Sequence, residues 1–373
     1  MYDRRTLLKQ TGALATAATA GLAGCLEVLA SVDEEQPPAY IDRLGTDDDG
    51  WVDFGYVNWD ELTAATLDAD VVEEYETQLD PGEVMHGYPL EGITMLSERL
   101  TVELAGPGLE GLLRPYPSLG EFDIERDEAD PVNEYDSTVE DVLTVNDALV
   151  LSGSIDVEEI AGVLRETPEE NTLRREYERT DTLGDYDIYA PADGEFSIGD
   201  PTLAVSDDAI VASRGEDGIE PITAVIETAA GESERANDSI EEFDWLLEHA
   251  GKGHIVFGGY GEPTSIVVGT PIEQYDRWGN TNSVANPFSQ FGLVNGAVSS
   301  ITFEESATTN ATFAAYYEYD TIDDSFEATL RGRLASSATE RSVAVNTNLH
   351  RVLATATWKS VSESDDGNES VED

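Results

Sequence analysis

The stretch Leu143-Thr-Val-Asn-Asp-Ala-Leu-Val-Leu-Ser152 and the residues that follow it decide the expected fold. Two apolar runs flank the polar pair Asn146-Asp147, which is the pattern of a β-hairpin. Asp156 is a suitable N-cap for a helix, and Glu159 three residues later completes a capping box. The apolar residues of this helix share one face: Ile160, Val163 and Leu164. The stretch therefore predicts two paired strands and a helix.

A second stretch, Leu203-Ala-Val-Ser-Asp-Asp-Ala-Ile-Val-Ala-Ser213, has the same pattern. Each expected helix ends in Glu-Thr, and 20 residues separate Asp147 from Thr167, as they separate Asp208 from Thr228. A fainter third unit covers residues 301–334. The units are either products of internal duplication or independent uses of a common arrangement. Both interpretations predict an α+β fold with largely antiparallel sheets, helices packed on one face, and repeated β-β-α units.

The rest of the chain alternates between strand-like and helix-like patterns. A hairpin is expected where residues 175–180 and 186–189 flank Gly184. A helix is expected where Ser239 and Glu242 form a second capping box before Gly251. Further strands are expected at residues 50–57, 255–257, 301–304, 313–319, 342–346 and 352–358, and further helices from residue 59 and around Ile322, Phe326, Leu330 and Leu334.

The composition bounds the possible functions. The chain has 373 residues, of which 40% are hydrophobic, so it can bury a core and is not a disordered acidic tail. Its 20 Lys and Arg stand against 78 Asp and Glu, a net charge of −58, which argues against a nucleic-acid partner. With a single cysteine, the chain has neither an internal disulfide nor a cysteine-based zinc site.

The acidic residues are spread along the chain rather than gathered in blocks. Only two lysines, Lys252 and Lys359, follow Cys25. Carboxylates at this density repel one another, and salt reduces this repulsion because the Debye length falls from about 10 Å in ordinary buffer to about 3 Å at molar concentration. This composition is typical of proteins from extremely halophilic organisms; the alternative is an acidic mesophilic protein with a special partner.

The N-terminus has the pattern of an export signal. Arg4 and Arg5 precede Leu7-Leu8-Lys9 and a weakly apolar run rich in Ala, Gly and Thr. The paired arginines mark the twin-arginine (Tat) type, which exports folded proteins. The apolar run is too short and too mild for a transmembrane helix. Residues 1–24 are therefore predicted to be a signal peptide, and the pattern resembles the Tat signals of haloarchaea.

The run ends in Leu22-Ala23-Gly24-Cys25, which resembles the lipobox of exported lipoproteins. That resemblance implies a lipid on the thiol of Cys25, which becomes the first residue of the mature protein. The alternative is a free cysteine near an ordinary cleavage site. The expected organisation is then a lipidated tether at residues 25–40, an α+β domain with the internal repeat at 41–260, a C-terminal α+β subdomain at 261–359 and a disordered acidic tail at 360–373.

Three elements of the central region resemble a group of haloarchaeal Tat-exported lipoproteins of unknown function. They are Val150-Leu-Ser-Gly-Ser-Ile-Asp156, Gly184-Asp-Tyr-Asp-Ile-Tyr189 and Ser206-Asp-Asp-Ala-Ile-Val211. More loosely, the region is similar to bacterial surface proteins built from repeated strand–strand–helix units. The resemblance covers residues 140–260 and implies a fold and a location but no chemistry.

No assembled catalytic or metal site is expected. His249 and His254 are five residues apart, which does not place them on one helical face, and the other histidines are His86 and His350. The turn at Asp47-Asp48-Asp49-Gly50 lacks the ligand spacing of a calcium loop. Gly258-Gly259-Tyr260-Gly261 favours a bulge or turn over a ligand contact. No nucleophile elbow or phosphate loop is present, and no cofactor or metal is expected.

One region lacks acidic residues, from Arg277 to Phe303. Its aromatic residues Trp278, Phe288 and Phe291 make it a candidate loop for binding a glycan or a surface protein, unless it is uncharged because it is buried. Possible glycosylation sites are the three Asn-x-Ser/Thr sequons: Asn237, Asn310 and Asn368.

These patterns predict a non-catalytic lipoprotein on the extracellular face of a haloarchaeal membrane, serving as a binding or envelope-structural module. Its partners are then membrane lipid through Cys25, the Tat translocase during export, and a surface protein or glycan, but not nucleic acid. A solute-binding lipoprotein of a transporter is one alternative, although such proteins have parallel-sheet lobes. A hydrolase with an unrecognised site is the other.

Overall fold

The computed structural model describes residues 38–58, 60–61, 136–166, 176–194, 201–214, 218–261, 294–304, 308–317, 322–336 and 338–359. The chain divides into the units Met1–Pro37 and Pro38–Asp373, and all described residues belong to the second. The signal peptide with Arg4 and Arg5, the lipid site and several other predicted residues lie outside the described residues: Cys25, His86, Trp278, Phe288, Phe291 and Asn368.

Runs of two to four strands are separated by helices along the described chain. The strands are β1 (Val52–Asn58), β2 (Thr138–Val145), β3 (Ala148–Ser154), β4 (Tyr177–Leu183), β5 (Tyr186–Pro191), β6 (Pro201–Val205), β7 (Ala209–Arg214), β8 (Ile255–Tyr260), β9 (Val294–Glu304), β10 (Thr308–Tyr317), β11 (Glu340–Asn346) and β12 (Arg351–Lys359). The helices are η1 (Ala39–Arg43), α8 (Val157–Arg165), α9 (Ile219–Ala230), α10 (Ala236–Ser239), α11 (Glu241–Ala250) and α12 (Asp324–Arg333).

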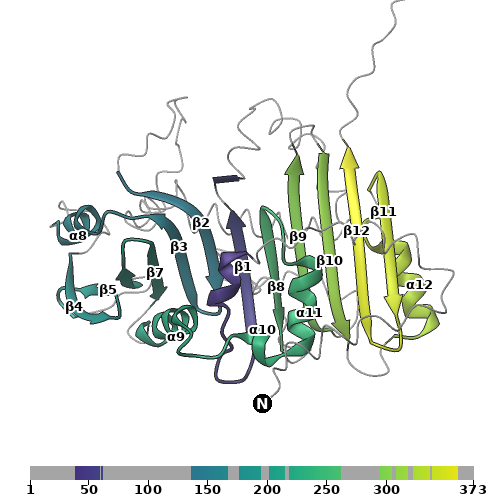
Figure 1. Ribbon diagram of the computed structural model, residues 1–373, viewed down its shortest axis with the longest axis horizontal. Coiled ribbons are helices and arrows are strands. Elements are labelled where there is room, and N and C mark those ends of the chain that lie inside the picture. Colours follow the sequence, from purple (N-terminus) through teal and green to yellow (C-terminus); the bar gives the residue numbers. More distant parts are fainter. Residues whose placement is uncertain are drawn as a thin grey trace, which may run out of the picture. The chain divides into compact units, whose positions relative to one another are not determined.

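The described strands form one 12-stranded sheet, in the order β11-β12-β10-β9-β8-β1-β2-β3-β7-β6-β5-β4 (Figure 1). Every neighbouring pair is antiparallel. The expected α+β class with largely antiparallel strands is therefore confirmed. The boundary expected near residue 260 falls between β8 and β9, which pair with each other, so the sheet continues across it.

Helices pack on both faces of the sheet, so the expectation that they lie on one face is wrong. Successive strand residues alternate between two buried clusters, as Tyr56 and Val57 do in β1. Helices α8 and α12 contribute to the cluster with Val57, for example through Ile160 and Leu330. Helices η1, α9 and α11 contribute to the cluster with Tyr56. Both faces of the sheet carry buried apolar residues, whereas a sheet covered by helices on one face needs them on that face alone.

The hairpins of the two similar stretches are confirmed as β2–β3 and β6–β7. They lie next to each other because β3 pairs with β7. The helices that follow them differ, since α8 packs on one face of the sheet and α9 on the other. A two-fold rotation about an axis perpendicular to the sheet exchanges two neighbouring antiparallel hairpins and leaves each face of the sheet on its own side. This rotation would leave α8 on the face opposite α9, so it does not superpose the two β-β-α segments.

The two expected capping boxes have different outcomes. The N-cap half of the first box is confirmed, because the side chain of Asp156 accepts hydrogen bonds from the N–H groups of Glu158 and Glu159 at 3.0 and 3.1 Å. Its other half is wrong: the carboxylate of Glu159 accepts from Asp136 and Ser137, and the N–H of Asp156 donates to the hydroxyl of Ser137. The capping box of Ser239 and Glu242 is wrong, because Ser239 ends the separate helix α10 and Ile240 precedes α11 without a side-chain cap. The hydroxyl of Ser239 instead bonds to the carbonyl of Arg235 at 3.2 Å.

Glycines 258 and 259 lie inside β8, whose pairing with β1 and β9 shows no register shift. The predicted bulge or turn is therefore absent at this place in the described sheet. A Cβ at Gly258 would lie 2.5 Å from the carbonyl oxygen of Ala297, and one at Gly259 would lie 2.6 Å from that of Val52. These glycines permit a close approach of neighbouring strands rather than of a ligand.

Candidate functional site

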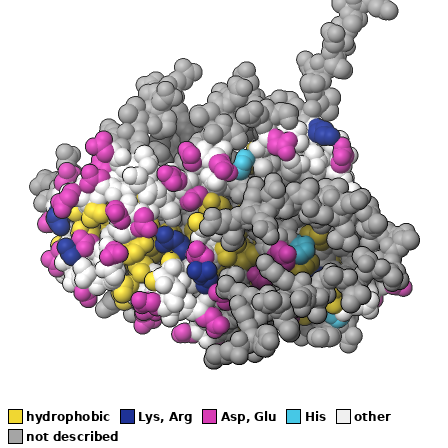
Figure 2. All heavy atoms as spheres, viewed as in Figure 1, with side chains coloured by type: hydrophobic (Ala, Val, Ile, Leu, Met, Phe, Trp, Pro, Cys, Tyr) yellow, Lys and Arg dark blue, Asp and Glu magenta, His cyan; other side chains and the backbone are white. Residues whose placement is uncertain are grey.

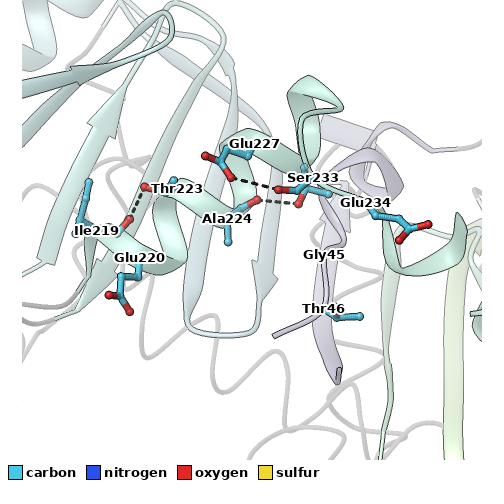
Figure 3. A pocket seen from close by; sticks show the side chains of 10 residues that line it. Gly45, Thr46, Ile219, Glu220, Thr223, Ala224, Glu227, Ser233 and Glu234 are labelled. Carbon is cyan, nitrogen blue, oxygen red and sulfur yellow. Dashed lines mark hydrogen bonds between the residues drawn. The ribbon is translucent and has the colours of Figure 1, made fainter. Parts of the chain in front are cut away.

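A hollow of about 470 Å³ lies beside α9. It is lined by residues from α9, from the turn after it and from the connection between η1 and β1: Gly45, Thr46, Ile219, Glu220, Thr223, Ala224, Glu227, Thr228, Ser233 and Glu234 (Figure 3). Gly45 packs closely here, since a Cβ would lie 2.8 Å from the hydroxyl of Thr228. The hollow is therefore formed where the first turn of the body meets the end of α9.

The lining of this hollow is acidic. It contains three carboxylates, those of Glu220, Glu227 and Glu234, and no basic side chain or histidine. The hydroxyl of Ser233 donates to the carboxylate of Glu227 at 3.2 Å. Such a lining attracts cations, but in a chain where about one residue in five is acidic it is also expected from composition alone. It has no group arranged as a nucleophile with a base.

A second polar group lies at the ends of β1, β2 and β8. Asn58 faces Asp141 across β1 and β2, and its N–H donates to the carbonyl of His254 at 2.8 Å. The hydroxyl of Tyr56 donates to the carboxylate of Asp141 at 2.6 Å. Nε2 of His254 lies 3.7 Å from the carboxylate of Glu61. The antiparallel pairing thus brings together residues that are far apart in the sequence.

The electrostatics of this group favour neutral side chains. Burial raises the pKa of Asp141, and the nearby carboxylates of Glu140, Glu61 and Asp60 add to the rise, while the Tyr56 hydroxyl opposes it. Burial lowers the pKa of His254 against the opposing effect of Glu61. Nδ1 of His254 accepts from the N–H of Phe303 at 3.3 Å, so in the neutral ring Nε2 carries the proton and can donate it toward Glu61.

The described histidines lie apart from one another in separate structural roles. Nδ1 of His249 lies 2.9 Å from the carbonyl of Trp245, and its ring lies 4.7 Å from the ring of Trp245. His350 lies in the turn between β11 and β12, where its carbonyl accepts from Tyr317. Within the described residues, no group of three or more His, Cys, Asp or Glu side chains is placed to hold a metal ion.

The Asp47 turn uses its side chain for its own structure. One carboxylate oxygen of Asp47 accepts from the N–H groups of Asp49 and Trp51, at 3.0 and 2.8 Å. Gly50 adopts a φ of 80°, which an L-residue rarely adopts. This arrangement is a hydrogen-bonded turn rather than a set of carboxylates that converge on an ion.

The two described sequons are engaged in the fold. Asn310 lies in β10 between β9 and β12, where its amide nitrogen donates to Glu304 at 2.7 Å and its amide oxygen accepts from Thr357 at 2.8 Å. Asn237 is half-buried in α10 and its side chain bonds to Asp244. A glycan on either residue would replace one of the two hydrogens of an amide nitrogen whose side chain already contacts a neighbouring element.

Part of the acid-free span belongs to the sheet. Residues 294–303 lie in β9, and Val294, Ala297 and Ile301 are buried there. Burial therefore accounts for the missing charges at this end of the span, whereas the proposed binding loop itself falls outside the described residues.

Sequence reasoning missed Tyr56, Glu61 and Asp141. No sequence signal distinguished them, because carboxylates occur throughout the chain and the three residues meet only through long-range strand pairing. Among the described helices, none is long and apolar enough to cross a membrane. The chain matches no protein-family model, no curated protein and no solved structure.

Proposed function

We propose that this chain is a lipoprotein on the extracellular face of a halophilic archaeal membrane, where it serves as a non-catalytic binding or envelope-structural module. The observation that carries the proposal is the order of segments. A twin-arginine pattern and a lipobox ending at Cys25 precede the compact unit that begins at Pro38. The residues between Cys25 and this unit, the first part of the tether expected at 25–40, then join a lipid anchor to a folded body, and a body attached through two lipid chains would be held stably.

The surface of the body supports adaptation to high salt. Among the described residues, every buried polar or charged residue is a serine or a threonine, so all described carboxylates contact solvent at least in part. Figure 2 shows acidic side chains spread over the described part of one face, with few Lys or Arg among them. Ion pairs such as Arg235–Asp42 and Arg331–Glu327, both at 2.8 Å, can neutralise only a small share of this charge.

Strand direction favours a binding or structural module over the solute-binding alternative. Solute-binding lipoproteins have lobes of parallel strands, whereas all neighbouring strands described here are antiparallel. The hydrolase alternative has one supporting observation, the group around Asp141, in which a carboxyl with a raised pKa can act as an acid. The hollow beside α9 is lined by other residues than this group, so we place the hydrolase second.

The internal repeat is better described by a longer unit than β-β-α. The strand order β1-β2-β3-β7-β6 in the first half corresponds to β8-β9-β10-β12-β11 in the second. In both halves the helix after the third strand, α8 or α12, packs on the same face of the sheet. We propose that these halves are duplicated units joined by the β1–β8 pairing, with β4 and β5 inserted. Hydrogen exchange should then detect two protected regions that open separately; a single cooperative opening would contradict this.

Cell fractionation of the Cys25→Ser variant tests the proposed function. The wild-type chain should remain with the membrane, and the variant should appear in the medium. A matched control restores a thiol at another tether position, as in the double variant Cys25→Ser with Ser31→Cys, which should also be released. Membrane retention of Cys25→Ser would contradict lipid anchoring through this residue.

A further inference from the structure

The part of the sheet formed by β9, β10, β12 and β11 has an uncharged region on one face. Val298 and Ala314 belong to the buried cluster with Tyr56, and Leu353 packs against it. Alternate residues of a strand share a face, so the side chains that follow at intervals of two lie on this same face. They include six hydroxyl and amide side chains, which we call the hydroxyl face: Thr302, Asn310, Thr312, Ser342, Thr355 and Thr357.

The strand pairing arranges the hydroxyl face in two rows. One row contains Thr312, Thr355 and Ser342, and the other contains Thr302, Asn310 and Thr357. All six residues are half-buried, whereas the residues between them on the opposite face are buried, for example Ala311 and Ala356. This end of the sheet is therefore packed on one face and partly accessible on the other.

Other parts of the chain border the hydroxyl face on two sides. On β12, the guanidinium of Arg351 lies 4.7 Å from the ring centre of Trp245, so α11 borders the face there. On β9, Ser300 is 3% exposed, and a Cβ on Gly253 would lie 3.1 Å from the Cβ of Ser300. The accessible region thus begins at Thr302 on β9 and beyond Arg351 on β12.

No residue of the hydroxyl face carries a charge, in a chain with 78 Asp and Glu. The charged residues at the strand ends on this side have partners. Lys359 and Glu340 form an ion pair at 2.6 Å, and Glu304 accepts from the amide of Asn310 at 2.7 Å. Figure 2 shows uncharged surface at the upper right, where these strands end, with charged side chains along its border. A charged ligand would find no opposite charge within the face.

Three hydroxyl groups of the face are free to bond to a ligand. Within the described part of the chain, the hydroxyls of Thr302, Thr312 and Thr355 form no hydrogen bond. A hydroxyl group both donates and accepts hydrogen bonds, so it suits a partner whose own groups do the same.

The side chain of Asn310 is held in one orientation. Its amide nitrogen donates to Glu304, and its amide oxygen accepts from the hydroxyl of Thr357 at 2.8 Å. The second hydrogen of this amide remains a donor, and the oxygen of Thr357 remains an acceptor. A fixed donor beside a fixed acceptor matches two adjacent hydroxyl groups of a sugar, and binding then orders no further side chain here.

The size of the hydroxyl face selects among partners. Four strands about 4.8 Å apart and two rows about 7 Å apart cover about 19 Å by 14 Å, on the order of 300 Å². A second copy of the chain would need about 800 Å² on each partner for a stable interface. Since the face has no charge, and since charges act over only about 3 Å at molar salt, a neutral ligand fits better than an ionic one.

We propose that the hydroxyl face binds a short neutral glycan, which lies across β10 and β12 and bonds through its hydroxyl groups to Asn310, Thr312, Thr355 and Thr357. This deepens, and rests on, the proposed function as a binding module, because it names the class of ligand. The glycan contacts do not involve the lipid anchor. Loss of glycan binding would leave the membrane retention of the wild-type chain unchanged, and release of the Cys25→Ser variant would leave glycan binding unchanged, so the two proposals fail separately.

Saturation-transfer difference NMR of the full chain, in detergent at molar salt, tests the proposal. The probes are neutral trisaccharides of glucose, galactose, mannose and N-acetylglucosamine, with an oligogalacturonate as the anionic comparison. At least one neutral probe should bind with a dissociation constant of about 1 mM or lower, and more tightly than the anionic one. The constant should change by less than about twofold when the salt concentration is doubled. Absence of binding by every neutral probe, or binding that weakens steeply with salt, would overturn the proposal.

Threonine-to-valine variants provide the second measurement, because they remove a hydroxyl and keep the shape of the side chain. Thr312→Val and Thr355→Val should each raise the dissociation constant by about fivefold. Thr182→Val is the matched control, since Thr182 is an exposed threonine of β4 on the opposite side of the sheet, and it should bind like the wild type.

The melting temperatures of these variants at the same salt concentration show whether each is folded. They should equal that of the wild type, because the removed hydroxyls of Thr312 and Thr355 have no partner in the described part of the chain. Unchanged glycan binding by the folded Thr312→Val and Thr355→Val variants would overturn the proposal. A wild-type dimer that these two substitutions dissociate would do so as well, since the occupant of the face would then be a second copy.

Discussion

Replacement of Ser137 by alanine should destabilise the body, because Ser137, directly before β2, forms hydrogen bonds to Asp156 and Glu159 at the start of α8. The Ser137 hydroxyl donates to the carboxylate of Glu159 at 2.7 Å and accepts from the N–H of Asp156 at 2.9 Å. Ser137 is only 1% exposed, so Ser137→Ala leaves the N–H of Asp156 without this partner in a buried place, whereas the carboxylate of Glu159 reaches solvent and keeps the N–H groups of Asp136 and Ser137 as donors. Water therefore offsets part of the loss at Glu159, and Ser137→Ala should cost about 1–2 kcal/mol.

Urea unfolding at constant molar salt measures this loss. Ser154→Ala is the matched control, because Ser154 is exposed at the end of β3, and it should stay within about 0.5 kcal/mol of the wild type. If Ser137→Ala lowered the free energy of unfolding no more than Ser154→Ala, the hydrogen bonds of Ser137 would not contribute to stability and the reasoning would be refuted.

The pH dependence of stability provides a second test, because Glu159 in this group of hydrogen bonds is titratable. Burial raises the pKa of Glu159, but hydrogen bonds from the Ser137 hydroxyl and from the N–H groups of Asp136 and Ser137 lower it more, so the net pKa is lowered from its ordinary value of 4.5. A group with a lowered folded pKa stabilises the fold above its unfolded pKa, and this contribution disappears as pH falls through the folded pKa. Glu159→Gln should therefore reduce the difference in stability between neutral and acidic pH, and an unchanged difference would contradict this assignment.

Three further outcomes are expected. Dialysis into dilute buffer should unfold the body because the carboxylates then repel one another with little screening, and a native circular dichroism spectrum without salt would contradict this. Asp141→Asn should leave the free energy of unfolding at neutral pH equal to that of the wild type or higher. The pKa of Asp141 is raised in the folded state, so the protonated carboxyl stabilises the fold at low pH, and this contribution is lost as pH rises through the folded pKa. A clear loss in urea unfolding would count against that expectation. Gly258→Ala should cost about 1–3 kcal/mol because its Cβ would lie 2.5 Å from a carbonyl oxygen of β9. Gly162→Ala, at an exposed position of α8, should gain up to about 1 kcal/mol; equal effects would argue against the close strand approach.

Local patterns predicted the elements that depend on neighbouring residues. The hairpin β2–β3 forms as expected because apolar alternation and the Asn146-Asp147 turn act within a few residues. The same holds for the hairpin at Gly184, whose φ of 58° suits glycine, and for the cap of α8 by Asp156.

Long-range contacts account for what the sequence did not predict. The helix expected after Ser239 forms as α11, but the separate short helix α10 that precedes it was not expected; the N–H of Ala236 in α10 donates to the carbonyl of Leu44 at 2.8 Å. The group around Asp141 depends on the pairing of β1 with both β2 and β8, which join segments far apart in the chain. In so acidic a sequence, no local pattern marks one carboxylate as different.

Mass spectrometry of the chain purified from its native membrane tests the central claim most directly. The account predicts a mature protein that begins at residue 25, with a lipid attached to the sulfur of that cysteine. A chain that still begins at Met1, or one with an unmodified thiol, would contradict it.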